Sequence, residues 1–313
     1  MASLGEAGGS PAGPRAGGFQ TGELLAQGRY RVGRELNRGG AAVVYEGLDL
    51  QAAPPAAVAL KCHDLRHAER QALERLKREI LYAKEMAHAN VVRLLNVFVD
   101  NECLVLVLEL VRGSDLLEVI NRRGGRLGEP EARLYFQQLL SGVLGLHRSN
   151  LAHRDIKPEN CMIDLQTNTL KVIDMGLSKH LTSARTLGVG TPDYMAPELI
   201  SFGLPHGGGG LGYNASAADV WSMGATLYLM TVGVYPFEDQ RNPRDMCATL
   251  KNVLAGRYRP LRPGLLSAEC EDLLGRMLVP RPADRITLAE VAQHPWVARV
   301  DDLPPAAPPR SAP

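Results

Sequence analysis

Two short segments of the chain carry the side chains best suited to chemistry. The first, at residues 153–160, reads H-R-D-I-K-P-E-N. It places a carboxylate, an ammonium and an amide at fixed offsets, on Asp155, Lys157 and Asn160. A second carboxylate follows at Asp174. In phosphoryl transfer a carboxylate orients the attacking hydroxyl, an ammonium steadies the moving phosphate, and hard oxygens hold magnesium on the nucleotide. These segments therefore predict phosphoryl-transfer chemistry.

Eight residues in order, followed at the right distance by D-x-G at 174–176, make the chain similar to the eukaryotic protein kinases. The resemblance implies an α+β fold with two lobes, a small one on an antiparallel sheet and a larger, mainly helical one. It implies ATP and Mg²⁺ as cofactors. It also implies that Asp155 orients the hydroxyl with Lys157 beside it, and that Asn160 and Asp174 bind magnesium.

Composition and the resemblance together divide the chain into four parts. The N-terminal segment is rich in Gly, Ala and Pro and lacks the large apolar side chains of a core, which predicts disorder. An organelle transit peptide is the alternative there, although the segment has little basic character. We expect the following parts: a disordered segment at 1–27, a small lobe at 28–111, a large lobe at 112–300 and a disordered tail at 301–313.

The overall charge and the cysteines bear on partners and compartment. The net charge is +1, which favours neither nucleic acid nor a membrane surface as partner. The five cysteines are scattered and odd in number, which favours reduced thiols in the cytoplasm, with access to the nucleus open. No apolar run approaches the roughly 18 residues of a membrane span.

A glycine-rich hairpin is expected early in the chain. Strands are predicted over residues 30–36 and 42–47, and the resemblance places the phosphate-binding loop between them. In the family pattern G-x-G-x-x-G, Asn37 takes the first place, Gly39 the second and Ala42 the third. Glycine lets backbone amides approach a phosphate without a Cβ in the way.

The resemblance implies nucleotide contacts spread along the chain. Apolar side chains enclose the adenine, backbone groups of residues 109–111 bond its edge, and Asp115 reaches the ribose. Core packing explains the apolar members almost as well. The expected contacts are Leu36, Gly39, Val44, Ala59, Lys61, Glu79, Glu109, Val111, Asp115 and Met162.

The lysine at the end of the predicted strand 58–61 has two interpretations. A solvated strand-end lysine is the commoner fate. The resemblance instead places Lys61 on the nucleotide phosphates, paired with a glutamate of the helix predicted over residues 69–86. Glu79 lies in the central part of that helix, but other glutamates are present and spacing alone does not choose among them.

Acidic residues suggest how a protein substrate is recognised. Asp115 and Glu118 are three apart and therefore share one helix face. With Glu159 they form an acidic surface that, by the resemblance, holds an arginine upstream of the phosphorylated residue. Solvated helix carboxylates are the alternative.

The segment at residues 176–198 resembles an activation segment. Thr191 is expected to bond toward Asp155 and Lys157, a feature of serine/threonine kinases. Ser183 and Thr186 are the leading sites for a regulatory phosphate, which orders a loop by pairing with arginine. Arg154 is the expected partner of that phosphate.

Two structural contacts and two helices are also expected in the large lobe. The resemblance pairs Glu198 with Arg285 and makes Asp219 brace the backbone of the catalytic loop. A long amphipathic helix is predicted over residues 129–147, and a buried helix is predicted to open at Asp219.

Residues 227–240 narrow the resemblance to the plant sucrose-non-fermenting-related kinases, in the calcium/calmodulin-dependent-kinase-like group. We therefore predict a monomeric serine/threonine kinase that phosphorylates proteins and is switched by an upstream kinase. One alternative is a pseudokinase that acts as a nucleotide-binding scaffold, motivated by the altered glycine loop and by Met175 in place of phenylalanine. Another is a metabolite kinase.

Overall fold

The computed structural model describes residues 18–39, 42–66, 86–174, 192–202, 214–243 and 245–299, with six further residues between positions 73 and 84. The chain divides into two compact units. The first comprises Met1–His67 and Leu95–Leu110, and the second comprises Ala68–Leu94 and Val111–Pro313. Residues 68–94, expected in the small lobe, thus group with the second unit.

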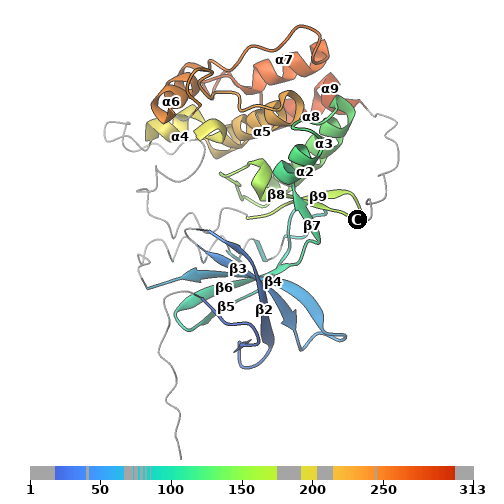
Figure 1. Ribbon diagram of the computed structural model, residues 1–313, viewed down its shortest axis with the longest axis vertical. Coiled ribbons are helices and arrows are strands. Elements are labelled where there is room, and N and C mark those ends of the chain that lie inside the picture. The colour runs from blue at the N-terminus through green and yellow to red at the C-terminus, as the bar shows by residue number, and fades with distance from the viewer. Residues whose placement is uncertain are drawn as a thin grey trace, which may run out of the picture. The chain divides into compact units, whose positions relative to one another are not determined.

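The first unit is built on a six-stranded sheet in the order β1-β2-β3-β4-β6-β5 (Figure 1). The pairs from β1 to β4, and β4 with β6, are antiparallel. The strands are β1 (Leu24–Leu25), β2 (Tyr30–Arg38), β3 (Val43–Asp49), β4 (Ala56–Asp64), β5 (Leu94–Asp100) and β6 (Cys103–Glu109).

One face of this sheet forms the core of the first unit. Alternate residues of β4, namely Val58, Leu60 and Cys62, point to that face and are buried. Tyr45 and Val107 pack with them from the neighbouring strands. Side chains at the intervening positions must therefore lie on the other face, and Lys61 is one of them.

The second unit is mainly helical and also holds a small antiparallel sheet (Figure 1). The strands of that sheet are β7 (Gly113–Asp115), β8 (Cys161–Asp164) and β9 (Thr169–Val172). The helices are α2 (Leu116–Arg122), α3 (Glu129–Arg148), α4 (Pro197–Phe202), α5 (Ala215–Val232), α6 (Met246–Ala255), α7 (Ala268–Met277), α8 (Leu288–Gln293) and α9 (Pro295–Ala298), with 3-10 turns η1 (Pro158–Asn160) and η3 (Pro192–Tyr194).

Helix α5 is the centre of the second unit. Almost all of its residues are buried, as expected of a helix that is apolar around its whole circumference. The Asn214 side chain caps its start by accepting a hydrogen bond from the N–H of Ala217. Gly233 ends it in a left-handed conformation with a φ of 82°. The helix therefore opens four residues before the predicted start at Asp219, because Asn214 supplies the cap.

Most predicted elements are confirmed with small shifts at their ends. The predicted helix over residues 129–147 is α3, and the predicted strands over 30–36 and 42–47 are β2 and β3. Of the helix predicted over residues 69–86, the described positions between 73 and 84 are helical. Met86 is described and is not helical, so the predicted end of the helix at residue 86 is wrong, and the other positions lie outside the described residues.

Candidate active site

A buried carboxylate holds the backbone of the catalytic loop, residues 153–160, which pairs with no strand in the part of the chain that the structure describes. Asp219, in α5, is fully buried. Its Oδ2 accepts a hydrogen bond from the N–H of His153 at 3.0 Å, and its Oδ1 accepts one from the N–H of Arg154 at 2.8 Å. Nε2 of His147 in α3 lies 2.7 Å from the same Oδ2. The predicted brace is confirmed, and it joins two helices to the loop.

The imidazole of His153 connects the two motifs recognised in the sequence. Its Nδ1 accepts a hydrogen bond from the N–H of Asp155 at 3.2 Å, so the neutral ring carries its proton on Nε2. That Nε2–H donates to the carbonyl of Ile173 at 3.0 Å. The N–H of Ile173 in turn donates to the carbonyl of Asn160 at 2.9 Å. The catalytic loop and the residue before Asp174 are thus fixed to one another.

One carboxylate oxygen, Oδ2 of Asp155, is contacted by both Lys157 and Asn160. Nδ2 of Asn160 donates to Oδ2 of Asp155 at 3.1 Å and to its backbone carbonyl at 2.7 Å. Nζ of Lys157 lies 3.3 Å from the same Oδ2. The Asp155 and Lys157 side chains keep 31% and 29% of their surface exposed, so a hydroxyl from outside can reach them. The buried Asn160 fixes the carboxylate from behind.

The donor atoms next to this carboxylate fit a hard cation. Asn160 uses its amide nitrogen on Asp155, which leaves its amide oxygen as the donor for a cation. Asp174 is half-buried and adds a carboxylate. Carboxylate and amide oxygens are ligands that Mg²⁺ accepts, and it commonly takes its remaining ligands from phosphates and water.

Two residues of the site have left-handed backbones. Arg154 has a φ of 63° and Asp174 a φ of 58°. Neither is glycine, so each conformation costs on the order of 1 kcal/mol. Such conformations cluster at functional sites, where surrounding bonds impose them. For Arg154 that bond is the one from its N–H to Asp219.

The predicted substrate-side acids lie at the start of α2 and in η1. Oδ1 of Asp115 accepts a hydrogen bond from the N–H of Glu118 at 2.8 Å, which caps α2. Asp115 is also the cross-strand partner of Met162, so two predicted nucleotide contacts are neighbours. The exposed Glu118 forms an ion pair with Arg122. Glu159 has a buried Oε2 that has no hydrogen-bond partner among the described residues.

Three predicted nucleotide contacts of the first unit, Val44, Ala59 and Lys61, share the sheet face opposite its core. Val44 is directly opposite Lys61 in the register of β3 and β4. Ala59 is directly opposite Leu108 in the register of β4 and β6. Opposite residues of an antiparallel pair share a face, as do positions two apart. Lys61 is only 8% exposed, which disagrees with the alternative of a solvated strand-end lysine.

The remaining predicted contacts are placed less tightly. Leu36 is 40% exposed in β2. The N–H of Gly39 donates to the carbonyl of Ala42 at 2.9 Å, which closes the β2–β3 hairpin. Glu109 ends β6, and the half-buried Val111 begins the last segment of the second unit. Four predicted residues lie outside the described part of the chain: Glu79, Ser183, Thr186 and Thr191.

The predicted pair between Glu198 and Arg285 is confirmed. Nη1 and Nη2 of Arg285 donate to Oε1 and Oε2 of Glu198 at 2.7 and 3.0 Å. Nη1 also donates to the carbonyl of Ala217 at 2.6 Å. Because the Arg285 side chain is completely buried, this two-point contact fixes α4 against α5.

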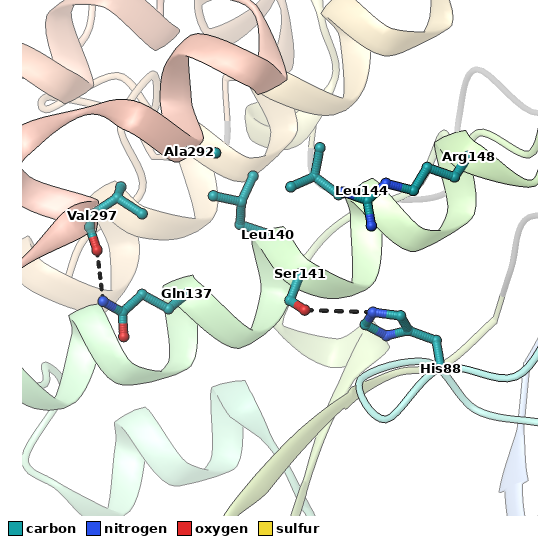
Figure 2. Close-up of a pocket in the computed structure, with 8 residues that line it drawn as sticks. All are labelled: His88, Gln137, Leu140, Ser141, Leu144, Arg148, Ala292 and Val297. Atoms are coloured by element: carbon teal, nitrogen blue, oxygen red, sulfur yellow. Dashed lines mark hydrogen bonds between the residues drawn. The ribbon is translucent and has the colours of Figure 1, made fainter. Parts of the chain in front are cut away.

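A cavity of about 200 Å³ lies elsewhere in the second unit, along α3 (Figure 2). Figure 2 shows His88 directed at Ser141, 3.5 Å from Nε2 to Oγ, and Gln137 bonded to the carbonyl of Val297. Burial, with a smaller contribution from nearby cationic side chains, lowers the pKa of His88. None of the predicted site residues that the structure describes lines this cavity.

Two residues near the site could not be singled out from the sequence. His147 bonds Asp219, but a histidine at the end of an amphipathic helix carries no distinctive signal. Asp193 lies in η3 and accepts a hydrogen bond from the N–H of Phe237 at 3.1 Å. Burial, with a contribution from Glu238, raises the pKa of Asp193 to about 6. Its burial depends on tertiary packing, which the local sequence does not encode.

This fold and site define a class of protein. Residues 30–297 match the family model described as the protein kinase domain. The chain therefore belongs to the protein kinase domain family, whose members generally use ATP and Mg²⁺.

The curated relatives are plant kinases. The chain is 41% identical over 226 residues to serine/threonine-protein kinase SRK2F of Arabidopsis thaliana, which covers 71% of this chain and 62% of the relative. It is 39% identical over 242 residues to serine/threonine-protein kinase SAPK4 of Oryza sativa subsp. japonica, covering 76% and 64%. These matches confirm the predicted resemblance to plant kinases. The aligned residues span less than two thirds of the length of these relatives.

No helix among the described residues is long and apolar enough to cross a membrane.

Proposed function

We propose that this protein is a serine/threonine kinase that transfers the γ-phosphate of ATP to hydroxyls of protein substrates. The observation that carries the proposal is the convergence of Asn160 and Lys157 on Oδ2 of the accessible Asp155. The type of acceptor is supported by Lys157, two residues after Asp155, and by the relatives, which are named serine/threonine-protein kinases.

The catalytic loop would act mainly by positioning and by charge. Asp155 accepts a hydrogen bond from the incoming hydroxyl and turns its oxygen toward the phosphorus. Asn160 keeps the carboxylate in that orientation through its Nδ2. Lys157, 3.3 Å from Oδ2, places a positive charge where negative charge develops on the transferred group. The side chain of Asp219 holds the loop backbone throughout.

Mg-ATP would supply the transferable phosphoryl group and neutralise charge on it. Asn160 and Asp174 would hold the magnesium through oxygen atoms, and Lys61 would bind phosphate oxygens in partnership with Glu79. The apolar side chains on the open sheet face would cover the adenine, and Asp115 would bond the ribose. The complete expected set is Leu36, Gly39, Val44, Ala59, Lys61, Glu79, Glu109, Val111, Asp115, Met162, Asn160 and Asp174.

The substrate would carry an arginine upstream of the acceptor. Support comes from Glu118 and Glu159, because the buried Oε2 of Glu159 has no hydrogen-bond partner among the described residues. A guanidinium would satisfy that oxygen with a charge-assisted bond.

Regulation is proposed through the segment at residues 176–198. Phosphate on Ser183 or Thr186, placed by an upstream kinase, would order the segment near Arg154, and Thr191 would then bond toward Asp155. We also propose that the protein is a monomer. Because all five cysteines are free, we propose a reducing compartment, the cytoplasm or nucleus.

The test is transfer of labelled phosphate from Mg-ATP to a peptide with arginine three residues before serine. Matched peptides carry tyrosine for serine, or alanine for the arginine. We expect Asp155→Asn and Lys61→Met each to reduce the rate by about 100-fold or more. Only the peptide that carries both the arginine and the serine should be labelled well.

ATP binding, followed by a fluorescent analogue, separates the outcomes. Retained binding by Asp155→Asn with lost transfer supports the assigned roles. If the intact protein binds ATP but transfers nothing, even after an upstream kinase has phosphorylated it, the proposal is wrong and the scaffold alternative holds.

A further inference from the structure

A second, larger cavity lies in the helical unit beside α6, and none of the described residues of the proposed catalytic machinery lines it. Its volume is about 370 Å³, well above what a single water molecule needs. Figure 1 shows α6, the next helix after α5 along the chain, beside α4. The cavity is lined by Pro236, Glu238, Asp239, Gln240, Arg241, Asn252, Arg257, Tyr258, Arg259 and Pro260.

The walls of this cavity are fixed by the fold. The N–H of Arg259 donates to the carbonyl of Pro236 at 2.7 Å, and Nδ2 of Asn252 donates to the carbonyl of Phe237 at 3.0 Å. Phe237 is fully buried and stacks on Trp221 with ring centroids 5.0 Å apart. The two loop segments that face each other across the cavity are therefore held at a set spacing, as a preformed binding site requires.

Positive charge dominates the lining. Three arginines, Arg241, Arg257 and Arg259, share the cavity with two carboxylates, Glu238 and Asp239. Within the part of the chain that the structure describes, the guanidinium groups of these arginines make no hydrogen bond and no ion pair. Oδ1 of Asp239 accepts instead from the backbone N–H groups of residues 241 and 242, at 2.9 and 2.8 Å.

One of the arginines carries a buried donor that lacks a partner. Nε of Arg259 is shielded from solvent and has no hydrogen-bond acceptor among the described residues. A buried charged donor in this state destabilises the fold unless an acceptor satisfies it. Arg241 and Arg257 are exposed, so an acceptor can enter from solvent.

Guanidinium groups bind planar or tetrahedral oxyanions through paired N–H···O bonds. A carboxylate has two oxygens, and a single arginine can satisfy both. A phosphate monoester has three terminal oxygens and close to two negative charges, so it can use several arginines at once. We propose that this arginine pocket binds the phosphoryl group of a phosphorylated serine or threonine on a protein partner.

The surroundings favour a protein segment over a nucleic acid. A continuous phosphate backbone needs an extended basic surface, whereas this lining offers three arginines interrupted by two carboxylates. The apolar surfaces of Pro236, Tyr258 and Pro260 border the arginines and suit the side chains that flank a phosphorylated residue. The pocket would thus retain partners that are already phosphorylated, which is a function beyond phosphate transfer and does not depend on it.

The test is fluorescence anisotropy of the full chain, without ATP, using a short labelled peptide with one phosphoserine flanked by leucine and proline. Matched peptides carry unmodified serine or glutamate at that position. Inorganic phosphate and a single-stranded oligonucleotide serve as competitors. We expect the phosphoserine peptide to bind at least about tenfold more tightly than either matched peptide.

The key variant combines Arg241→Ala with Arg257→Ala, because both side chains are exposed and their loss should leave the fold intact. Arg281→Ala is the matched control, since Arg281 is 87% exposed, lies in the same unit and does not line the cavity. A urea unfolding curve for each variant verifies that it is folded.

We expect the double variant to weaken phosphopeptide binding by at least about tenfold and the control to change it less than about twofold. Competition by inorganic phosphate would support the pocket as well. Equal binding of the phosphorylated and unmodified peptides would overturn the proposal. So would equal binding of the glutamate peptide, unchanged binding by the double variant, or an oligonucleotide that competes more strongly than the phosphopeptide itself.

Discussion

The catalytic loop of the second unit and the sheet face opposite the core of the first unit differ in how the fold holds their candidate site residues. The loop pairs with no described strand, and the buried Asp219 accepts hydrogen bonds from its backbone at His153 and Arg154. On the sheet face, the backbones of β3 and β4 hydrogen-bond to each other. The alternation of side chains along these strands is what directs Val44 and Lys61 to that face.

The difference concerns how closely stability and activity are linked. In the loop, the same hydrogen bonds keep the unit folded and orient Asp155, so a change there should damage both. On the sheet face, the ladder of backbone bonds is independent of the side chains that face away from the core. A change there should damage activity alone. Four predictions test this contrast, ordered by the size of the change in free energy of unfolding.

Replacing Asp219 should have the largest effect. Asp219→Ala removes the acceptor of three groups and leaves buried donors unsatisfied. We expect the free energy of unfolding to fall by on the order of 4 kcal/mol and phosphate transfer to be lost. Urea unfolding followed by tryptophan fluorescence reports on the second unit, since both tryptophans, Trp221 and Trp296, are buried there.

Asp219→Asn is the control for that prediction. The amide keeps one acceptor oxygen but presents an N–H₂ group to the remaining donors, so an intermediate loss is expected. A loss of less than about 1 kcal/mol in Asp219→Ala would show that the loop is held by other contacts and would break the contrast.

Asp193 tests whether a buried carboxylate of the second unit always stabilises it. Burial raises the pKa of Asp193 to about 6, above its value in an unfolded chain. The group therefore stabilises the fold only while it is protonated, and this contribution is lost as pH rises through about 6. Asp193→Asn removes the charge and keeps an oxygen for the N–H of Phe237.

We expect Asp193→Asn to raise the free energy of unfolding at pH 7 by up to about 3 kcal/mol and to change it little at pH 4. Urea unfolding at both pH values measures the difference. An equal gain at both values would exclude titration of Asp193 as the cause.

Gly47, on the core face of the first unit, tests whether a change there, unlike one on the opposite face, lowers stability. A Cβ on Gly47 would lie 2.7 Å from Cδ1 and Cγ of Leu60, in the packed core. We expect Gly47→Ala to lower the free energy of unfolding by about 2 kcal/mol through overpacking. Hydrogen exchange of the β3 and β4 amides measures the loss, because both tryptophans lie in the second unit.

Gly39→Ala provides the matched control. A Cβ there would meet only the carbonyl of Ala42, at 3.7 Å. Exchange rates in β3 and β4 should therefore change little. If the two substitutions had equal effects, packing at Gly47 could not be the reason.

Much of the site could be predicted because its chemistry has a fixed spacing in the chain. Asp155, Lys157 and Asn160 come from one short motif, and the structure brings them onto a single oxygen. The shared sheet face of Val44 and Lys61 is known from the register of β3 and β4 in the structure. The arginine pocket could not be predicted, since Arg241 and Arg259 become neighbours only through the packing of Phe237 and Pro236. The raised pKa of Asp193 likewise depends on tertiary burial.

Lys61→Met should show the smallest change in stability together with a large loss of activity. Lys61 is almost fully buried, but its alkyl stem can be replaced by the methionine side chain, and the β4 ladder to β3 and β6 keeps its backbone bonds. We expect the free energy of unfolding to change by less than about 1 kcal/mol, while phosphate transfer falls by about 100-fold or more. Hydrogen exchange of β4 measures the first quantity, and the peptide assay measures the second. If β4 lost its protection in this variant, the ammonium itself would be holding the first unit together. The sheet face would then link stability to activity as the catalytic loop does.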